Sequence, residues 1–235
     1  MTKFIFDFKR NHCDYCYGFC NIITRGANQI DVSVFEKMRN VRVLAANESL
    51  LPGVDLPGGF FSIIEGHLLL QLQFGDCYKT VKICGPGEVI GMGHWFINNS
   101  YQFCALESTT LCYFEKGVFT ELMRSNPEAS VQFLQYFAEQ LHHRELRVAA
   151  LQNISVKNRV CSVLFSLSKK FGVNSKDGLV IGISVSRKVI SELCGTSVES
   201  LSRVISELQE DFIIERLGRK IIILDVSKLL RLATS

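Results

Sequence analysis

The clearest fold signal lies in residues 186–208, which read SRKVISELCGTSVESLSRVISEL. Apolar residues recur at helical spacing on both sides of Gly195, and each set would form the inner face of one helix. These inner positions are Val189, Ile190 and Leu193, followed by Leu201, Val204, Ile205 and Leu208. Gly195 suits a sharp turn that needs a positive φ, and Ser197 suits the N-cap of the second helix. The stretch therefore predicts two helices joined by a tight turn.

The flanking sequence extends this motif. A helix is predicted at 157–171, a strand at 179–183, the paired helices at 186–193 and 197–210, and hairpin arms at 213–216 and 220–224. Gly218 would form the hairpin turn. A helix-turn-helix followed by a β-hairpin is a winged helix-turn-helix, a DNA-binding motif. The distribution of charge agrees with a DNA-binding C-terminal part. Residues 151–235 contain 13 Lys and Arg against 8 Asp and Glu, whereas residues 1–150 contain 13 Lys and Arg against 15 Asp and Glu.

The second helix of the motif would read bases. Its outward face carries Val198, Glu199, Ser202 and Arg203, and its N-terminal end would enter the major groove. An arginine can donate to guanine O6 and N7, and a glutamate can accept from cytosine N4. Phosphate contacts are expected around this helix. The complete predicted DNA-binding set is Ser186, Arg187, Ser197, Val198, Glu199, Ser202, Arg203, Arg216, Arg219 and Lys220.

The N-terminal half has a different sequence pattern, which is typical of β-strands. Short β-rich runs are predicted at 41–45, 60–65, 67–72, 80–83, 89–90, 101–105 and 111–114, with glycine-containing turns between several of them. This spacing indicates an all-β roll or barrel that extends to about Val118. Ser33 with Glu36 predicts a capped short helix at 33–40.

A long helix is predicted after Asn126 and Pro127, which suit an N-cap and a first helical position. Neither Gly nor Pro occurs from there until Gly172, and a break is expected near 153–155. An apolar seam runs along the helix at Val131, Leu134, Phe137, Ala138, Leu141, Val148 and Leu151. His142, His143, Arg144 and Glu145 interrupt it. We expect a partner helix to cover this seam, in a dimer that is either regulated or permanent.

The predicted fold class is α+β, in four segments: a Cys-rich arm at 1–30, a β-roll sensor domain at 31–125, a dimerisation helix at 126–154 and a winged helix-turn-helix domain at 155–235. Hydrophobic residues at 47% and charged residues at 21% fit a globular chain. The sequence contains neither an apolar run of about 18 residues nor a secretory h-region. We therefore expect a cytoplasmic protein with reduced thiols and no membrane partner.

The chain resembles the family of the cyclic-AMP receptor protein and the fumarate-nitrate reduction regulator (CRP/FNR). The resemblance rests on residues 51–55 (LPGVD), 64–68 (IEGHL) and 85–91 (GPGEVIG), and above all on Val198, Glu199, Ser202 and Arg203. It implies a cyclic-nucleotide-binding-type roll, a long dimer helix and a winged helix. It also implies a homodimer that binds double-stranded DNA and RNA polymerase. The recognition-helix residues are similar to those of the FNR branch, which reads TTGAT half-sites.

Members of this family respond to different signals, and the resemblance leaves two kinds of signal-binding site to compare. The cAMP-binding branch holds the cyclic phosphate with an Arg-Ser-Ala run, but the matching residues 98–104 (NNSYQFC) contain no cation, so no cAMP is expected. The FNR branch instead holds a [4Fe–4S] cluster with closely spaced thiols and one distant cysteine. The matching thiols are Cys13, Cys16 and Cys20 with Cys112, while Cys104 is a second candidate for the distant ligand.

The thiol spacing departs from that branch, because three residues rather than five separate Cys16 from Cys20. Zinc and a chance cluster therefore stay open as alternatives. The remaining cysteines, Cys77, Cys84, Cys161 and Cys194, are expected to be small core residues. His142 and His143 are expected to be solvated or at an interface.

Two regulator hypotheses remain. One is a redox- or oxygen-sensing dimer with a cluster, and the other is the same dimer without a cluster, which senses a small organic ligand or nothing. An enzyme is not expected, since the sequence contains no HExxH, Walker, GxGxxG or nucleophile-elbow motif.

Overall fold

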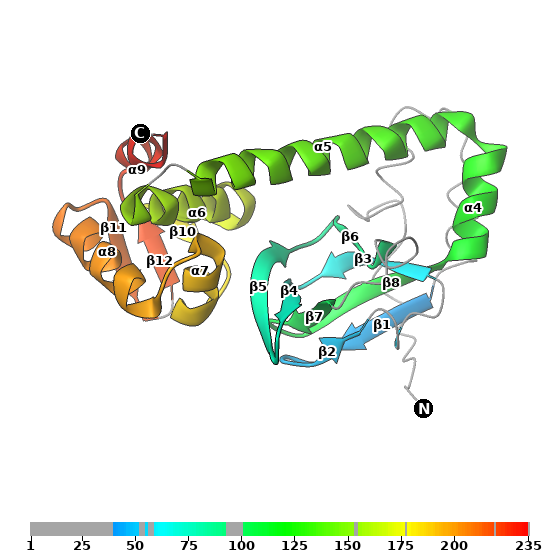
Figure 1. Ribbon diagram of the computed structural model, residues 1–235, viewed down its shortest axis with the longest axis horizontal. Helices are drawn as coiled ribbons and strands as arrows, with labels where there is room; N and C mark the ends of the chain where they lie inside the picture. Colours follow the sequence, from blue (N-terminus) through cyan, green and yellow to red (C-terminus); the bar gives the residue numbers. More distant parts are fainter. Residues whose placement is uncertain are drawn as a thin grey trace. The chain divides into compact units, whose positions relative to one another are not determined.

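The computed structural model describes residues 40–51, 55, 59–92, 101–152, 155–176, 178–218 and 220–234 (Figure 1). The predicted arm with Cys13, Cys16 and Cys20, and Arg219 in the hairpin, lie outside these residues. So does the helix predicted at 33–40, except for Asn40, which begins a strand. The chain divides into two compact units, residues 1–141 and 142–235. Among the described residues, no helix combines the length and apolar character that a membrane span requires.

The N-terminal unit is a roll of antiparallel strands in two sheets (Figure 1). One sheet has the order β1-β8-β3-β6 and the other β2-β7-β4-β5. The strands are β1 (Asn40–Leu44), β2 (Ser49–Leu50), β3 (Gly59–Glu65), β4 (Leu68–Phe74), β5 (Cys77–Cys84), β6 (Val89–Ile90), β7 (Tyr101–Ala105) and β8 (Thr109–Glu115). All seven predicted strands are present, and among the described residues of this unit the two-residue β2 is the one strand that was not predicted.

Alternating side chains on β8 connect two apolar cores. Leu111 faces the space between the sheets, where it packs with core residues of both sheets. Cys112 and Phe114 belong to a second cluster with Phe60. The rings of Phe60 and Phe114 stack with their centroids 5.1 Å apart. Because neighbouring strand residues point to opposite faces, this single strand serves both cores.

The helix that follows the roll corrects one prediction. The β-rich region was expected to reach about Val118, but α4 (Lys116–Ser125) begins directly after β8. α5 (Pro127–Gln152) then starts as predicted, since the backbone N–H of Ala129 donates to the Asn126 side-chain oxygen at 3.0 Å. The break between α5 and the next helix also falls where it was expected.

One face of α5 is fixed to the roll by polar contacts. The backbone N–H of Val89 donates to the Tyr136 hydroxyl at 3.2 Å, and Lys82 Nζ donates to Gln140 at 3.2 Å. Lys82 Nζ also pairs with Glu88 at 2.6 Å. Burial opposes the charge on Lys82, but Glu88 outweighs it, so the pKa of Lys82 is raised. The predicted apolar seam, with Val131 and Leu134, is exposed away from these contacts.

The C-terminal unit contains helices around a four-stranded sheet of order β11-β12-β10-β9 (Figure 1). Its elements are α6 (Val156–Phe171), β9 (Gly172–Ser175), β10 (Gly178–Ile181), α7 (Arg187–Cys194), α8 (Val198–Glu210), β11 (Ile214–Leu217), β12 (Lys220–Ile223) and α9 (Val226–Thr234). The predicted helices and hairpin are confirmed. β9 and α9 were not predicted.

The cysteines outside the arm divide into buried and exposed thiols. Cys84, Cys161 and Cys194 are buried, as predicted for small core residues. Burial raises the pKa of the Cys161 thiol to about 11, so it stays protonated at neutral pH. The same prediction is wrong for Cys77, which is exposed because it begins β5 directly after the two-residue turn at Gly75.

Candidate nucleic-acid interface

The turn between α7 and α8 has the geometry that its glycine predicts. Gly195 adopts φ 59° and ψ 45°, in the left-handed region that favours glycine. Its N–H donates to the Glu192 carbonyl at 3.1 Å, and the N–H of Thr196 donates to the Ser191 carbonyl at 3.0 Å. These bonds satisfy carbonyls that would otherwise lack partners where α7 ends. The chain can therefore turn sharply into α8.

α8 is capped at its start and buried along one face. The Ser197 hydroxyl accepts from the N–H of Ser200 at 3.1 Å, as the N-cap prediction requires. Ser186 caps α7 in the same way, accepting from Val189 at 3.2 Å. All predicted inner residues of α8 are buried: Leu201, Val204, Ile205 and Leu208. The two caps and the apolar face fix which side of α8 points outward.

The outward side of α8 carries the predicted base-reading residues. Val198, Glu199 and Arg203 are exposed, and Ser202 is partly exposed. The pKa of Glu199 is lowered, first by its own backbone N–H and then by Ser197, so its carboxylate is charged at neutral pH. The charged carboxylate of Glu199, an acceptor, and the guanidinium of Arg203, a forked donor, thus lie on the first two turns of α8. This is the arrangement that major-groove reading uses.

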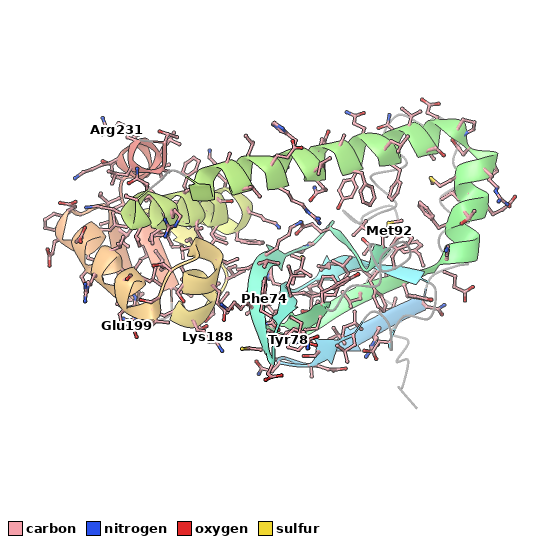
Figure 2. All side chains as sticks on the ribbon, viewed as in Figure 1. Phe74, Tyr78, Met92, Lys188, Glu199 and Arg231 are labelled. Atoms are coloured by element: carbon pink, nitrogen blue, oxygen red, sulfur yellow. The ribbon has the colours of Figure 1, made fainter. Side chains whose placement is uncertain are left out.

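Two further basic positions flank this helix. Arg187 and Lys188 are exposed in the first turn of α7. Figure 2 shows Lys188 and Glu199 along the same edge of the C-terminal unit. Lys188 was not predicted as a DNA contact, although its place beside Arg187 in the first turn of a capped helix could have indicated it. A cation on this edge suits a phosphate next to the bases that α8 would read.

The hairpin of β11 and β12 has the form of a wing. Leu217 pairs with Lys220 across its turn, and Gly218 takes a φ of 63°. Arg216 Nη2 donates to the Gly218 carbonyl at 3.2 Å, which ties this side chain to the turn. Lys220 is exposed. Of the three cations predicted here, the structure thus places Arg216 and Lys220 on the wing.

The predicted seam on α5 is an exposed apolar stripe. Val131 is 60% exposed and Leu134 is 67% exposed, and the other described members are exposed as well: Phe137, Ala138, Leu141 and Val148. Leu146 is a further exposed apolar residue that was not predicted. The Leu151 side chain lies outside the described residues. His142 and His143 are exposed, as expected for solvated or interface positions.

The two candidates for the distant cluster ligand lie in different sheets. Cys112 is buried on β8, between Val41 of β1 and Ser62 of β3, in the cluster that contains Phe60 and Phe114. Cys104 is partly exposed on β7, opposite Ser49. Within the described residues, no three His, Cys, Asp or Glu side chains gather where they could hold a metal.

The described roll contains one buried cation, Arg42 on β1. Its guanidinium pairs with Asp55 at 3.4 Å and with Glu48 at 3.5 Å. The apolar core between the sheets is formed by aliphatic and aromatic side chains such as Phe61 and Phe103. Arg42 is thus engaged by two carboxylates rather than presented to an anion. That no cAMP binds remains a prediction from the sequence.

Comparisons with known proteins agree with this geometry. Residues 158–232 match the family model of the Crp-like helix-turn-helix domain. The chain is 24% identical to electron transport regulator A of Shewanella oneidensis, over 94% of this chain and 90% of that protein. It is also 24% identical to the transcriptional activator protein Anr of Pseudomonas aeruginosa, over 94% and 92% of the two chains.

A solved structure shows the same fold over most of the chain. FixK2 from Bradyrhizobium japonicum superposes with a TM-score of 0.70 at 16% identity, over 84% of this chain and 98% of that one. The fold and the motif thus define a DNA-binding transcription regulator. Residues 158–232 belong to the Crp-like helix-turn-helix domain family, and the similarity over most of the chain agrees with the resemblance to CRP/FNR regulators noted in its sequence.

Proposed function

We propose that this regulator acts in the cytoplasm as a homodimer on a TTGAT-like inverted repeat, under the control of an oxygen- or redox-sensitive [4Fe–4S] cluster. RNA polymerase is its proposed partner at the promoter. The observation that carries the proposal is the outward face of α8, where Glu199, Ser202 and Arg203 stand opposite a fully buried apolar face. These are the residues whose pattern resembles that of the FNR branch.

The proposed base contacts follow from the chemistry of that face. Arg203 would donate two of its N–H groups to O6 and N7 of the half-site guanine, and Glu199 would accept from a cytosine amino group on the opposite strand. Ser202 would contact either a base or a phosphate. Arg187, Arg216 and Lys220 would neutralise phosphates, which fixes the position of α8 without reading sequence. The proposed DNA contacts of Ser186, Val198, Ser197 and Arg219 complete the set.

The exposed stripe on α5 supports the homodimer. A helix of 26 residues is about 39 Å long, and its roll-facing side is already occupied by contacts such as that of Tyr136. Complete burial of a Val or Leu side chain contributes roughly 1.5–3 kcal/mol, so a partner that covered the exposed parts of Val131, Leu134 and Leu141 would gain a large share of that for each. A second copy offers the same stripe at the same spacing. A two-fold pair of this kind would present two recognition helices about 34 Å apart.

The proposed signal input uses Cys13, Cys16 and Cys20 with Cys112 as cluster ligands. When bound, such a cluster supplies sensitivity to oxygen and redox state. The chain's own contribution is the burial of Cys112 in the apolar layer beside α4 and the start of α5, which links a ligand position to the dimer helix. Ordering the arm at Cys112 would then favour the paired state of α5.

A second candidate is the same DNA-binding dimer without a cluster, responding to a small organic ligand or to nothing. The observation that favours it is the thiol spacing, because three residues rather than the five of the FNR branch separate Cys16 from Cys20. In that case α5 would form a permanent dimer. The charged residues in the middle of the seam, such as Arg144 and Glu145, would then pair across the two chains.

Anaerobic purification separates the two candidates. With a cluster, the protein is brown, binds iron and bleaches in air. Replacing Cys13, Cys16, Cys20 or Cys112 singly with Ser should then remove the visible absorption. Cys77→Ser is the matched control, because Cys77 is an exposed thiol of the same roll.

The pattern of losses identifies the ligands. Retained iron in Cys112→Ser together with lost iron in Cys104→Ser would transfer the distant ligand to Cys104. Zinc without iron would discard the cluster. Light scattering with and without air, in parallel with operator binding, tests the regulated dimer. If the protein is a dimer both with and without air, and its DNA affinity is also unchanged by air, the second candidate is the one that remains.

A further inference from the structure

The start of α6 contacts the turn of the helix-turn-helix through one arginine. Arg159 Nε donates to the carbonyl of Cys194 at 3.0 Å, and its Nη2 donates to the carbonyl of Gly195 at 3.4 Å. Cys194 is the last residue of α7 and is fully buried, and Gly195 is the left-handed turn residue. One guanidinium thus holds two consecutive carbonyls at the point where the chain turns toward α8.

These two carbonyls are groups that a helix end leaves without intrahelical partners. The N–H groups of Gly195 and Thr196 are bonded to carbonyls one turn earlier in α7. Arg159 therefore completes the end of the helix, with its positive charge at the negative end of the α7 dipole. The planar fork of arginine constrains direction as well as distance, which a single ammonium cannot do.

The same helix also contacts the far end of α8. Lys157 Nζ pairs with Glu207 at 3.0 Å and with Asp211 at 3.7 Å, in the last turn and at the C-cap of α8. The hydrogen bond to Glu207 is the main cause that raises the pKa of Lys157, so the ammonium of Lys157 is charged at neutral pH. An exposed pair of this kind adds little to stability, but it restrains where the end of the helix lies.

We infer that Arg159 and Lys157 are positioning residues for DNA recognition, which hold the turn before α8 and the last turn of α8 from the first turn of α6. This inference rests on the proposed function of α8 as the base-reading helix. Neither residue lies on α8 or on the wing, so Arg159 acts through the turn that leads into α8 and Lys157 acts through the end of α8. Bidentate base contacts need side chains placed within about 0.5 Å. Loss of the restraint should therefore weaken specific binding and leave phosphate binding almost unchanged.

The test measures DNA affinity for the full chain and for Arg159→Ala. The specific duplex is the sequence that the unaltered protein selects from random DNA, and the reference duplex is a scrambled version. We expect Arg159→Ala to weaken binding to the selected site at least tenfold and to the scrambled duplex less than twofold. The slope of log K against log salt should not change.

A matched control removes a charge elsewhere in the same unit. Arg231→Ala does so on α9, which Figure 2 shows at an edge away from Glu199 and Lys188. Its ratio of specific to scrambled affinity should equal that of the unaltered protein. Circular dichroism and thermal unfolding establish that each variant is folded at the assay temperature.

A charge reversal covers the case in which Arg159→Ala does not fold. Lys157→Glu should lower the ratio of specific to scrambled affinity several-fold, because it repels Glu207 and Asp211. Adding Glu207→Lys restores an opposite-charge pair at the same place and should recover most of the ratio. A contact that contributes only to stability would change the melting temperature and leave the ratio unaltered.

Three results would overturn the inference. Equal losses on both duplexes, with a salt slope smaller by about 0.9, would make Arg159 a phosphate contact. Unaltered specific affinity in folded Arg159→Ala would reduce it to a structural contact. If the unaltered protein selected no sequence at all, α8 would not read bases, and Arg159 and Lys157 could not position it for that purpose. Selection of a sequence unlike TTGAT would contradict the proposed half-site alone, and the variants would still test the positioning.

Discussion

α8 and α5 are both amphipathic helices, yet they use their apolar faces in opposite ways. α8 buries Leu201 and Leu208 completely within its own unit and turns charged residues outward. α5 contacts the roll through Tyr136 and Gln140 and leaves Val131 and Leu134 in solvent. The apolar face of α8 therefore completes a fold within one chain, whereas the exposed face of α5 is the surface that the proposed homodimer would bury.

This difference separates apolar residues that are buried within their own unit from apolar residues that are exposed, two kinds that sequence periodicity does not distinguish. Both helices show apolar residues at helical spacing, and periodicity cannot tell whether the covering surface belongs to the same chain. The contacts distinguish them. Substitutions on α8 should therefore act on folding or base reading, and substitutions on the stripe of α5 should act on assembly.

The largest expected effect is on stability. Leu201→Ala should reduce the free energy of unfolding by about 2–5 kcal/mol, because it opens a cavity at a fully buried position. Leu134→Ala should change it only through association, so that its effect depends on protein concentration. Denaturant titrations at two concentrations measure both. A concentration-dependent loss for Leu201→Ala, with none for Leu134→Ala, would reverse the assignment of the two helices.

The next effect is on DNA affinity through assembly. The double variant Leu134→Asp/Leu141→Asp should be monomeric and should bind the full inverted repeat at least 100-fold more weakly, since the two half-sites no longer act together. Light scattering and fluorescence anisotropy measure this. Val173→Asp is the control, because Val173 is equally exposed on β9, outside the stripe. A dimeric double variant would refute the role of the stripe.

A smaller effect is expected at one base. Arg203→Ala should cost about 1–3 kcal/mol of binding at the half-site guanine and relax the preference at that position, because the forked donor is lost. Affinities for operators with each base at that position measure the change. A uniform loss for all four bases would instead indicate a phosphate contact. The dimer should be unaffected.

The smallest effect concerns the two N-caps. Ser197→Ala and Asn126→Ala should each cost about 1 kcal/mol of stability, because each removes an acceptor for a helix N–H. Only Ser197→Ala should also weaken operator binding, since the proposed base-reading residues lie on α8 and not on α5. Equal effects of the two substitutions on DNA affinity would contradict this division of roles.

Local sequence signals were enough to predict most elements of the two units. Gly195 and Ser197 specify the turn and the cap through their own backbone and hydroxyl chemistry, and both predictions are confirmed. α4 was missed because no side chain caps its start and none of its residues is buried. β9 was missed because it is fully exposed and contains Gly172 and Asn174, which are uncommon in strands.

The residues around the site that were missed depend on distant partners. Arg159 contacts carbonyls 35 and 36 positions away in the sequence, and its neighbours on α6 give no indication of that contact. Lys82 and Gln140 meet across 58 positions in the same way. Cys77 was expected in a core because cysteine is usually buried, but its position beside a hairpin turn exposes it.

Selection of binding sites from random duplex DNA, performed without air, tests the central claim most directly. The account predicts an inverted repeat with TTGAT-like half-sites about one helical turn apart, and relaxed selection at the guanine when Arg203→Ala is used. The two-fold symmetry of the selected sequence tests the proposed dimer. The bases of each half-site test the proposed contacts of Glu199, Ser202 and Arg203. An unrelated half-site, or a selected sequence without two-fold symmetry, would contradict the account.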